Sequence, residues 1–143
     1  MASGAFNKGK FLLASGGVSL LTHTIRVMLV DSSYTFDPDD QFVDDIAADE
    51  IGVSGYSRQT LANKDIVQDD LNDLARFEAD DISFGALAAG ETIGGAAIFR
   101  QVNDDTDSPL IAFYDLTDLP TDGGSVLLTW ANASQGSVLK FTS

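Results

Sequence analysis

Two short apolar runs separated by a polar loop dominate the hydrophobic pattern of the chain. The runs cover Ile93–Val102 and Leu110–Leu116, and the loop between them is Asn103–Ser108 followed by Pro109. Both runs are rich in β-branched and aromatic residues, which suit a pleated, half-buried surface. Pro109 lacks a backbone donor and pushes Ser108 to extended geometry, so the loop cannot continue a helix. The pattern predicts the central antiparallel strand pair of an all-β domain.

Thr22–Asp31 carries the next clear strand pattern. Its side chains alternate between two faces, and both faces are apolar. One face holds Ile25, Val27 and Leu29, and the other holds Met28 and Val30. We therefore expect a strand that is buried on both sides. His23, at the entrance of this strand, is the only histidine and has none of the partners that a triad or a metal site requires.

Shorter strands and polar turns alternate along the rest of the chain. Strands are expected at Gly55–Val67, Leu74–Phe77, Ile82–Phe84, Val126–Trp130 and Val138–Phe141. The turns are rich in Asp, Asn and Gly and are expected at Gln68–Asp73, Asp118–Gly124 and Asn132–Gly136. Turn signals recur roughly every 8–12 residues in the second half, which is typical of sandwiches and barrels. Gly94 and Gly95 lie inside an apolar run and predict a bulge or a close backbone approach.

One short helix is predicted near Gln41–Ala48. Asp37–Asp40, which includes Pro38, is a helix-start signal, and apolar residues then recur at helical spacing. Lys10–Ala14 fits either a short helix or a strand that Gly16 and Gly17 would end. Together these patterns predict a single all-β domain over residues 1–143. We expect an antiparallel sandwich or jelly-roll-like barrel with one or two short helices.

The charge and cysteine content of the chain argue against several classes of binding partner and site. Lys and Arg number 8 and Asp and Glu number 22, which gives a formal net charge of −14. Such a charge argues against nucleic acid as a partner, because phosphates need neutralising cations, and against anionic membrane surfaces. The chain has no cysteine, which excludes disulfides and thiolate metal sites. We expect a soluble protein that binds neither nucleic acid nor membrane.

Five pairs of adjacent Asp residues invite an acid–base or metal hypothesis. The pairs are Asp39-Asp40, Asp44-Asp45, Asp69-Asp70, Asp80-Asp81 and Asp104-Asp105. Adjacent side chains on a strand point to opposite faces, so neighbours in sequence do not by themselves form a site. All five pairs fall in expected turns or helix starts, where solvated charges are the simpler interpretation. A small carbohydrate-acting enzyme using such carboxylates is a remote alternative.

The loop with alternating Asn103, Asp105 and Asp107 is the best metal candidate, because alternation could present three oxygens to calcium. Ser108 and Tyr114, however, occupy the glycine and glutamate positions of the calcium-loop pattern. A charged loop that blunts a hairpin tip is the alternative. No phosphate loop or nucleophile elbow is present in the sequence. We predict that the protein is not an enzyme and has no catalytic, cofactor-binding or metal-binding residues.

The first residues, Met1–Gly9, are small, polar and glycine-bearing, which predicts a frayed terminus. The alternative is an arm, over residues 1–10, that is flexible or orders on a partner. Lys8 and Lys10 are half of the lysines in the chain, so this end is locally basic.

The order of signals resembles a group of small virion structural proteins of tailed bacteriophages, the head-decoration or cement proteins. The similarity runs from about Lys10 to Trp130. It is carried, in order, by THTIRVMLVDSSYTFDPDDQFVDDI, GYSRQTLANKDI, DDISFGAL, IGGAAIFRQV, SPLIAFYDL and a Gly-Gly turn into VLLTW. Members of such groups have also been described as tail or fibre components.

The resemblance implies a small β-rich module that binds the outside of the major capsid protein shell and stabilises the head. It implies a homo-oligomer, most often a trimer, on the capsid exterior of a virion assembled in the host cytoplasm. The basic, aromatic start of the chain is then the candidate for capsid contact, through Phe6, Lys8, Lys10 and Phe11. The alternative is a tail or fibre component that recognises a receptor, for which Tyr34, Phe36 and Tyr56 would supply aromatic surface unless they are buried in the core.

Overall fold

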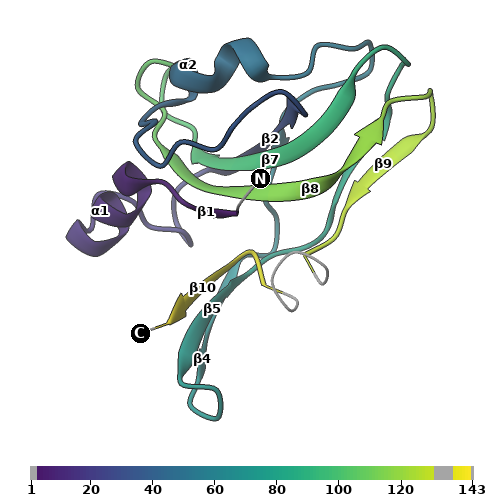
Figure 1. Ribbon diagram of the computed structural model, residues 1–143. Coiled ribbons are helices and arrows are strands. Elements are labelled where there is room, and N and C mark those ends of the chain that lie inside the picture. The colour runs from purple at the N-terminus through teal and green to yellow at the C-terminus, as the bar shows by residue number, and fades with distance from the viewer. Residues whose placement is uncertain (1–2, 131–136, 143) are drawn as a thin grey trace.

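A five-stranded antiparallel sheet in the order β1-β8-β7-β2-β3 forms the body of the protein (Figure 1). The computed structural model describes residues 3–130 and 137–142. The strands are β1 (Gly4–Ala5), β2 (Ile25–Asp31), β3 (Gln59–Thr60), β4 (Asp65–Asp69), β5 (Leu74–Glu78), β6 (Ile82–Ala86), β7 (Thr92–Arg100), β8 (Leu110–Pro120), β9 (Ser125–Leu128) and β10 (Leu139–Thr142). The helices are α1 (Asn7–Ser15), α2 (Val43–Ile46) and the 3₁₀ helix η1 (Ala47–Asp49). The predicted all-β antiparallel fold with short helices is confirmed.

The central strand pair predicted from the sequence is β7 and β8. The two strands pair antiparallel, with Ala97 opposite Phe113 and Ile98 opposite Ala112. On its other edge β7 pairs with β2, which places Met28 opposite Ala97. The longest strands therefore occupy the middle of the sheet, where their backbone groups bond on both sides.

Both faces of this sheet are buried, as the pattern of β2 predicts. On one face Ile25, Val27 and Leu29 join a cluster that includes Phe84 of β6, Leu128 of β9 and the fully buried Trp130. On the other face Met28 and Val30 pack with Phe6, Tyr34, Val43, Ile46, Phe99 and Phe113. Helix α2 and the loop before it thus cover one face, and the small β6–β9 sheet covers the other.

Gly95 lets the body pack around a large aromatic ring. A Cβ atom at this position would lie 2.3 Å from Cζ of Phe113 and 2.8 Å from the carbonyl oxygen of Tyr114. The pairing of β7 with β8 also shifts register between Ile93 and Gly95. The predicted bulge and close approach are confirmed.

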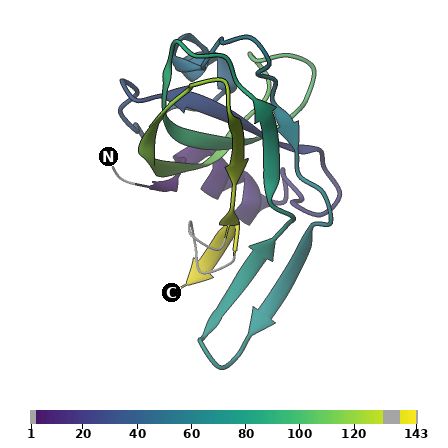
Figure 2. The same cartoon turned by 90° about the vertical axis from the view of Figure 1, so that its right-hand side faces the viewer.

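Strands β4 and β5 form a hairpin that extends away from the central sheet (Figures 1 and 2). Residues 65–78, which include the turn Asp70–Asp73, are called the arm below. β10 lies along β5, with Leu139 opposite Phe77 and Thr142 opposite Leu74. Phe77 and Val138 are buried and join the base of the arm to the core.

The single strand predicted over Gly55–Val67 is wrong. Only Gln59–Thr60 pairs with β2, and the next strand begins at Asp65. Between them the backbone of Asn63 adopts a positive φ of 52°, which turns the chain out of the body and into the arm. One apolar pattern in the sequence thus covers two strands of different sheets.

The helix predicted near Gln41–Ala48 is confirmed by α2 and η1, but its start differs. Asp37 accepts the backbone N–H of Asp39 within a turn (3.0 Å) and does not cap the helix. The carboxylate of Asp45 instead accepts the N–H groups of Gln41 (2.8 Å) and Phe42 (3.0 Å). The helix therefore begins at Val43.

Two of the predicted turns need comment. The turn predicted at Asp118–Gly124 begins later than expected, because β8 continues through Pro120. The turn predicted at Asn132–Gly136 lies outside the described residues. The predicted strands at Leu74–Phe77, Ile82–Phe84 and Val138–Phe141 correspond to β5, β6 and β10.

The frayed terminus predicted over Met1–Gly9 is wrong for residues 3–9, which are part of the folded body. Gly4 of β1 pairs opposite Phe113, and the N–H of Phe6 donates to the carbonyl of Ile111 (3.0 Å). Helix α1 follows and ends at Gly16, whose φ of 85° suits glycine. None of the described helices is long and apolar enough to cross a membrane.

Candidate functional site

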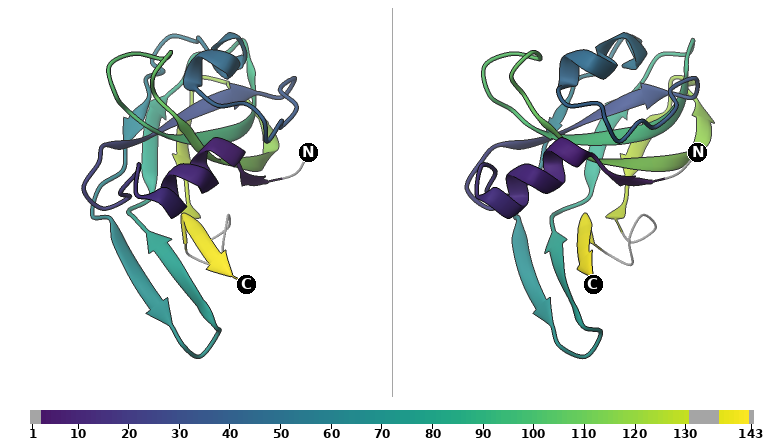
Figure 3. Two further views of the ribbon diagram at one scale, coloured as in Figure 1. Left: turned by 90° about the vertical axis from the view of Figure 1, so that its left-hand side faces the viewer. Right: turned by 60° about the vertical axis from the view of Figure 1, so that its left-hand side comes forward.

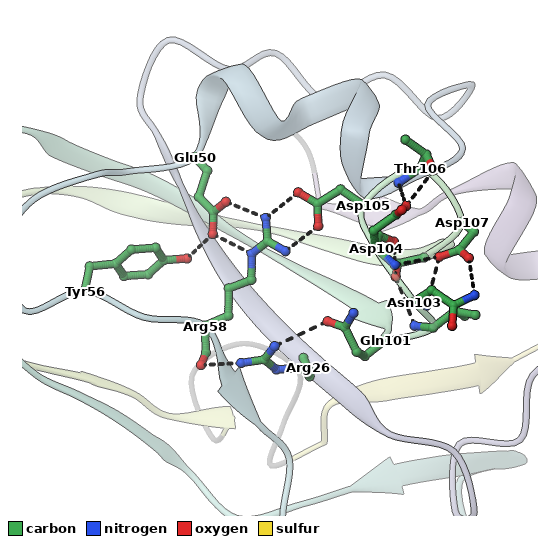
Figure 4. Close-up of polar contacts among 12 residues, drawn as sticks. Arg26, Glu50, Tyr56, Arg58, Gln101, Asn103, Asp104, Asp105, Thr106 and Asp107 are labelled. Carbon is green, nitrogen blue, oxygen red and sulfur yellow. Dashed lines mark hydrogen bonds and ion pairs between the residues drawn. The ribbon is translucent and has the colours of Figure 1, made fainter.

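The polar cluster around Arg58 is the most connected group of charges in the described chain (Figure 4). Its guanidinium donates to Glu50 through Nε (2.8 Å) and Nη2 (2.7 Å). It also donates to Asp105 through Nη1 (2.6 Å) and Nη2 (3.0 Å). Two bidentate carboxylates therefore share one planar cation, an arrangement that suits arginine and not lysine.

Each member of the cluster comes from a different segment. Glu50 follows η1, Arg58 precedes β3, and Asp105 lies in the loop between β7 and β8. Tyr56 donates its hydroxyl proton to Glu50 (2.7 Å) and accepts the N–H of Leu29 in β2 (3.0 Å). The cluster therefore ties three connecting segments to the central sheet.

The cluster also rests on the core. The guanidinium carbon of Arg58 lies 5.4 Å from the ring centre of Phe99 in β7, a cation–π distance. The side chain of Arg58 is 18% exposed, that of Glu50 15% and that of Asp105 35%. The ion pairs are therefore partly shielded from solvent, which strengthens them relative to pairs on the open surface.

The contacts shift the pKa values of Arg58, Asp105 and Tyr56. The hydrogen bonds that Arg58 donates to Glu50 and then to Asp105 raise the pKa of Arg58. The hydrogen bond from Arg58 lowers the pKa of Asp105. Burial, and then the charge of Glu50, raises the pKa of Tyr56, so its phenol keeps its proton. A saturated network of this kind holds segments together, and it leaves no base beside a nucleophile.

The structure separates the three residues of the calcium candidate (Figure 4). Asp107 accepts the backbone N–H and the side-chain amide of Asn103 (3.0 and 2.8 Å) and the N–H of Asp104 (2.9 Å). Asp105 points instead to Arg58. Asn103 and Asp107 thus lie together without Asp105. Over residues 3–130 and 137–142, no group of three or more His, Asp or Glu side chains is placed to hold a metal ion.

Adjacent carboxylates in the Asp pairs contact different partners. Asp80 accepts from Asn63 (2.6 Å), while Asp81 accepts the N–H of Trp130 (3.0 Å). Likewise Asp39 accepts from Asn7 (2.7 Å) and Asp40 from the hydroxyl of Tyr34 (3.0 Å). These two pairs therefore tie turns to other parts of the fold, which is more than the solvated charge that the sequence suggests.

The capsid-contact candidates do not share one surface. Phe6 is fully buried, with its ring 5.1 Å from that of Phe36, so it offers nothing to a partner in this fold. Phe11 is 64% exposed on α1, and Lys8 lies over the ring of Phe42 at 5.1 Å. Lys10 lies on the side of α1 that faces β10. Only Phe11 and Lys8 share an outward face.

The aromatic surface expected of a receptor-binding component is not assembled. Tyr34 is buried, and Phe36 stacks on Phe113 at 5.5 Å. Tyr56 is half-buried in the Arg58 cluster. The alternative expectation, that these side chains are buried against the core, is the one observed.

Sequence reasoning missed one feature of the surface. Leu71, at the tip of the arm, is 91% exposed, more than any other large apolar side chain of the described residues. The signal was present as a lone apolar residue in the polar stretch Gln68–Asp73. An apolar side chain held out on a turn contributes little to the core.

Comparisons with known proteins give no direct guide to function. No family model matches the chain, and no curated protein or solved structure is significantly similar to it.

Proposed function

We propose that the protein is a structural module that acts through protein–protein contacts, and that it stabilises a bacteriophage head by binding the outer surface of the major capsid protein shell. The observation that carries the proposal is the placement of exposed apolar side chains on projecting elements, Leu71 on the arm and Phe11 on α1. The finer assignment to the capsid rests on the ordered sequence resemblance to head-decoration proteins.

Apolar side chains at these places favour a partner. Burying a Leu or Phe side chain completely contributes about 1.5–3 kcal/mol. Phe11 and Leu71 leave most of that free energy unused in the isolated chain. A shell-binding protein would recover it on docking.

The outer face of α1 is the proposed shell contact. Phe11 and Lys8 line a hollow of about 370 Å³ with Asn7, Asp39 and Gln41. The hollow combines an aromatic side chain with a cation, a carboxylate and two amides. Aromatic residues are enriched in protein interfaces, and charged and polar groups surround them at the rim. Gly9 fixes the helix on the body, because a Cβ there would lie 2.6 Å from the Cα atom of Ile111. The contact face is thus presented by a helix that is held tightly to β8.

The net charge fits the same role. A formal charge of −14 on a chain of this size keeps copies that face solvent apart from other particles. The Arg58 cluster holds the connecting segments to the sheet without further chemistry. Trimers at local three-fold points of the shell, which the resemblance implies, are part of this proposal.

Binding to purified capsids of the phage that encodes the chain tests the proposal. We expect wild type to co-sediment with capsids, and Phe11→Ser and Lys8→Glu each to weaken binding at least tenfold. Leu127→Ser is the matched control, because Leu127 is also largely exposed (62%) but lies on β9, away from α1. Equal binding by Phe11→Ser and wild type would remove the α1 face from the proposal, and no binding by wild type would refute the capsid role.

A further inference from the structure

Strands β8 and β9 follow one another closely in the chain but do not pair. β8 ends at Pro120 and β9 begins at Ser125, and the chain turns back between them (Figures 2 and 3). Within the described chain β9 pairs with β6 alone, while β8 pairs with β7 and β1. Nearly all Cα atoms of β8 lie more than 8 Å from those of β9. A gap therefore separates the end of β8 from the free edge of β9.

A bulge interrupts β8 beside this gap. The pairs Gly95–Asp115 and Ile93–Leu119 leave three residues of β8, 116–118, opposite a single residue of β7. Bulged residues have no partner in the ladder, and a bulge bends its strand. The gap is thus flanked by an unpaired segment of β8 and by the unpaired edge of β9.

A hollow of about 320 Å³ lies between the two strands. Leu29 of β2 and Ile93 of β7, both buried, form its floor. On its flanks Leu119 of β8 is 46% exposed and Leu127 of β9 is 62% exposed. Two strands on either side of a third lie roughly 10 Å apart, because paired strands are about 4.8 Å apart. The hollow therefore has the width and the apolar lining for one further strand.

The charge around the hollow selects a basic occupant. The chain has no Lys, Arg or His between Arg100 and Lys140, a stretch that contains both strands. Asp118, in the unpaired segment of β8, is exposed. A second copy of the chain is a poor match, because its own edge strand β4 has Asp65 and Asp69 at its ends. Complementary charge instead favours a segment that carries lysine or arginine.

We propose that the gap between β8 and β9 binds an extended segment of another protein, with apolar residues at alternate positions and a lysine or arginine beside them. The segment pairs with the free edge of β9 as an added strand, because an unpaired edge offers a row of backbone donors and acceptors. Its apolar side chains lie over Leu29 and Ile93, and its cation lies near Asp118. This inference does not rest on the proposed capsid role, which concerns the outer face of α1.

A displayed library of random heptapeptides, selected on the immobilised protein, tests the chemistry of the occupant. We expect the selected peptides to alternate apolar with polar residues and to be enriched in lysine and arginine. A selection that enriches no peptide, or that enriches Asp and Glu, would overturn the proposal. A synthetic copy of the most enriched peptide is the probe for the next measurements.

Calorimetric titration of this peptide tests its place on the protein. Leu119→Ser and Leu127→Ser should each weaken binding about tenfold, because each removes apolar surface that the added strand covers. Leu71→Ser is the matched control, since it removes a more exposed leucine on the arm and should bind like wild type. Wild-type affinity in both β-strand variants, with their circular dichroism unchanged, would contradict the site. Leu127→Ser should still bind capsids in the preceding experiment, so the two proposals can fail separately.

N-methylation of the peptide tests the pairing of strands. Methyl groups on alternate backbone nitrogens remove the donors along one edge of the peptide. We expect at least one of the two alternately methylated peptides to lose binding, and retention of binding by both would rule out an added strand. Sedimentation velocity of the protein alone is the last control. Self-association of wild type that Leu127→Ser abolishes would assign the gap to a second copy and overturn its assignment to a basic segment.

Discussion

Removing the charge of Arg58 tests whether its cluster holds the fold together. Arg58→Met keeps an unbranched aliphatic side chain and deletes the guanidinium, with its donors to Glu50 and Asp105 and its contact with the Phe99 ring. An exposed ion pair contributes at most about 1 kcal/mol, whereas truncating one partner of a buried pair costs about 3–5 kcal/mol. The side chains here are 15–35% exposed and so lie between these limits. We expect the free energy of unfolding to fall by about 2–3 kcal/mol.

Urea unfolding followed by circular dichroism measures this loss. Arg100→Met is the matched control, because Arg100 donates to one carbonyl, that of Gly17 (3.0 Å), and should lose no more than about 1 kcal/mol. The double variant Arg58→Met with Glu50→Gln should lose less than the sum of the single losses, because the neutral amide no longer leaves a charge unpaired. A loss below about 0.5 kcal/mol for Arg58→Met, or strictly additive losses, would refute the structural role of the cluster.

Close contacts and pKa shifts elsewhere in the fold give three further predictions. Gly9→Ala should destabilise the fold by about 1 kcal/mol, because overpacking against the β8 backbone outweighs the usual helix preference for alanine. Ser15→Ala, at the exposed end of the same helix, is the control and should leave the free energy of unfolding in urea unchanged. The lowered pKa of Asp105 means that its contribution is complete above the unfolded-state pKa and is lost as pH falls through the folded value, so unfolding below about pH 4 should be less steeply acid-dependent in Asp105→Asn. Trp130→Phe removes the indole N–H that donates to the backbone carbonyl of Asp80 (2.9 Å) and should cost about 0.5–1.5 kcal/mol, so a thermal midpoint equal to that of wild type would contradict the hydrogen bond.

Local pattern sufficed to predict the central sheet. In β2 the alternation of Ile25, Val27 and Leu29 with Met28 and Val30 predicts burial on both faces, because each side chain's face follows from its position in the strand. The same holds for the β7–β8 pair, whose apolar runs and proline-bearing loop are contiguous in sequence. The formation of these strands is determined mainly by residues that are close together in the sequence, so the sequence pattern predicts them.

The prediction for the N-terminal segment was wrong for the opposite reason. Gly4, Ala5 and Phe6 are ordered by partners more than 100 residues away in β8. Nothing in their small, polar surroundings indicates that Phe6 would be fully buried. Long-range pairing therefore overrode a local composition that is typical of a frayed end.

The Arg58 cluster could not be predicted from the sequence for a related reason. Arg58 lies inside an expected strand, and its partners are 8 and 47 positions away. Asp105 looked like one of three calcium ligands, but the fold directs it to the cation. The tip of the arm is different, because Leu71 stood out as an isolated apolar residue in an Asp-rich turn and only its significance was missed.

The most direct test of the proposed role is the copy number of the protein in purified phage particles. Quantitative mass spectrometry of purified virions would count the protein against the major shell subunit. The account predicts a number of copies comparable with that of the shell subunit. A handful of copies per particle, or its absence from the particle, would contradict a role in stabilising the head.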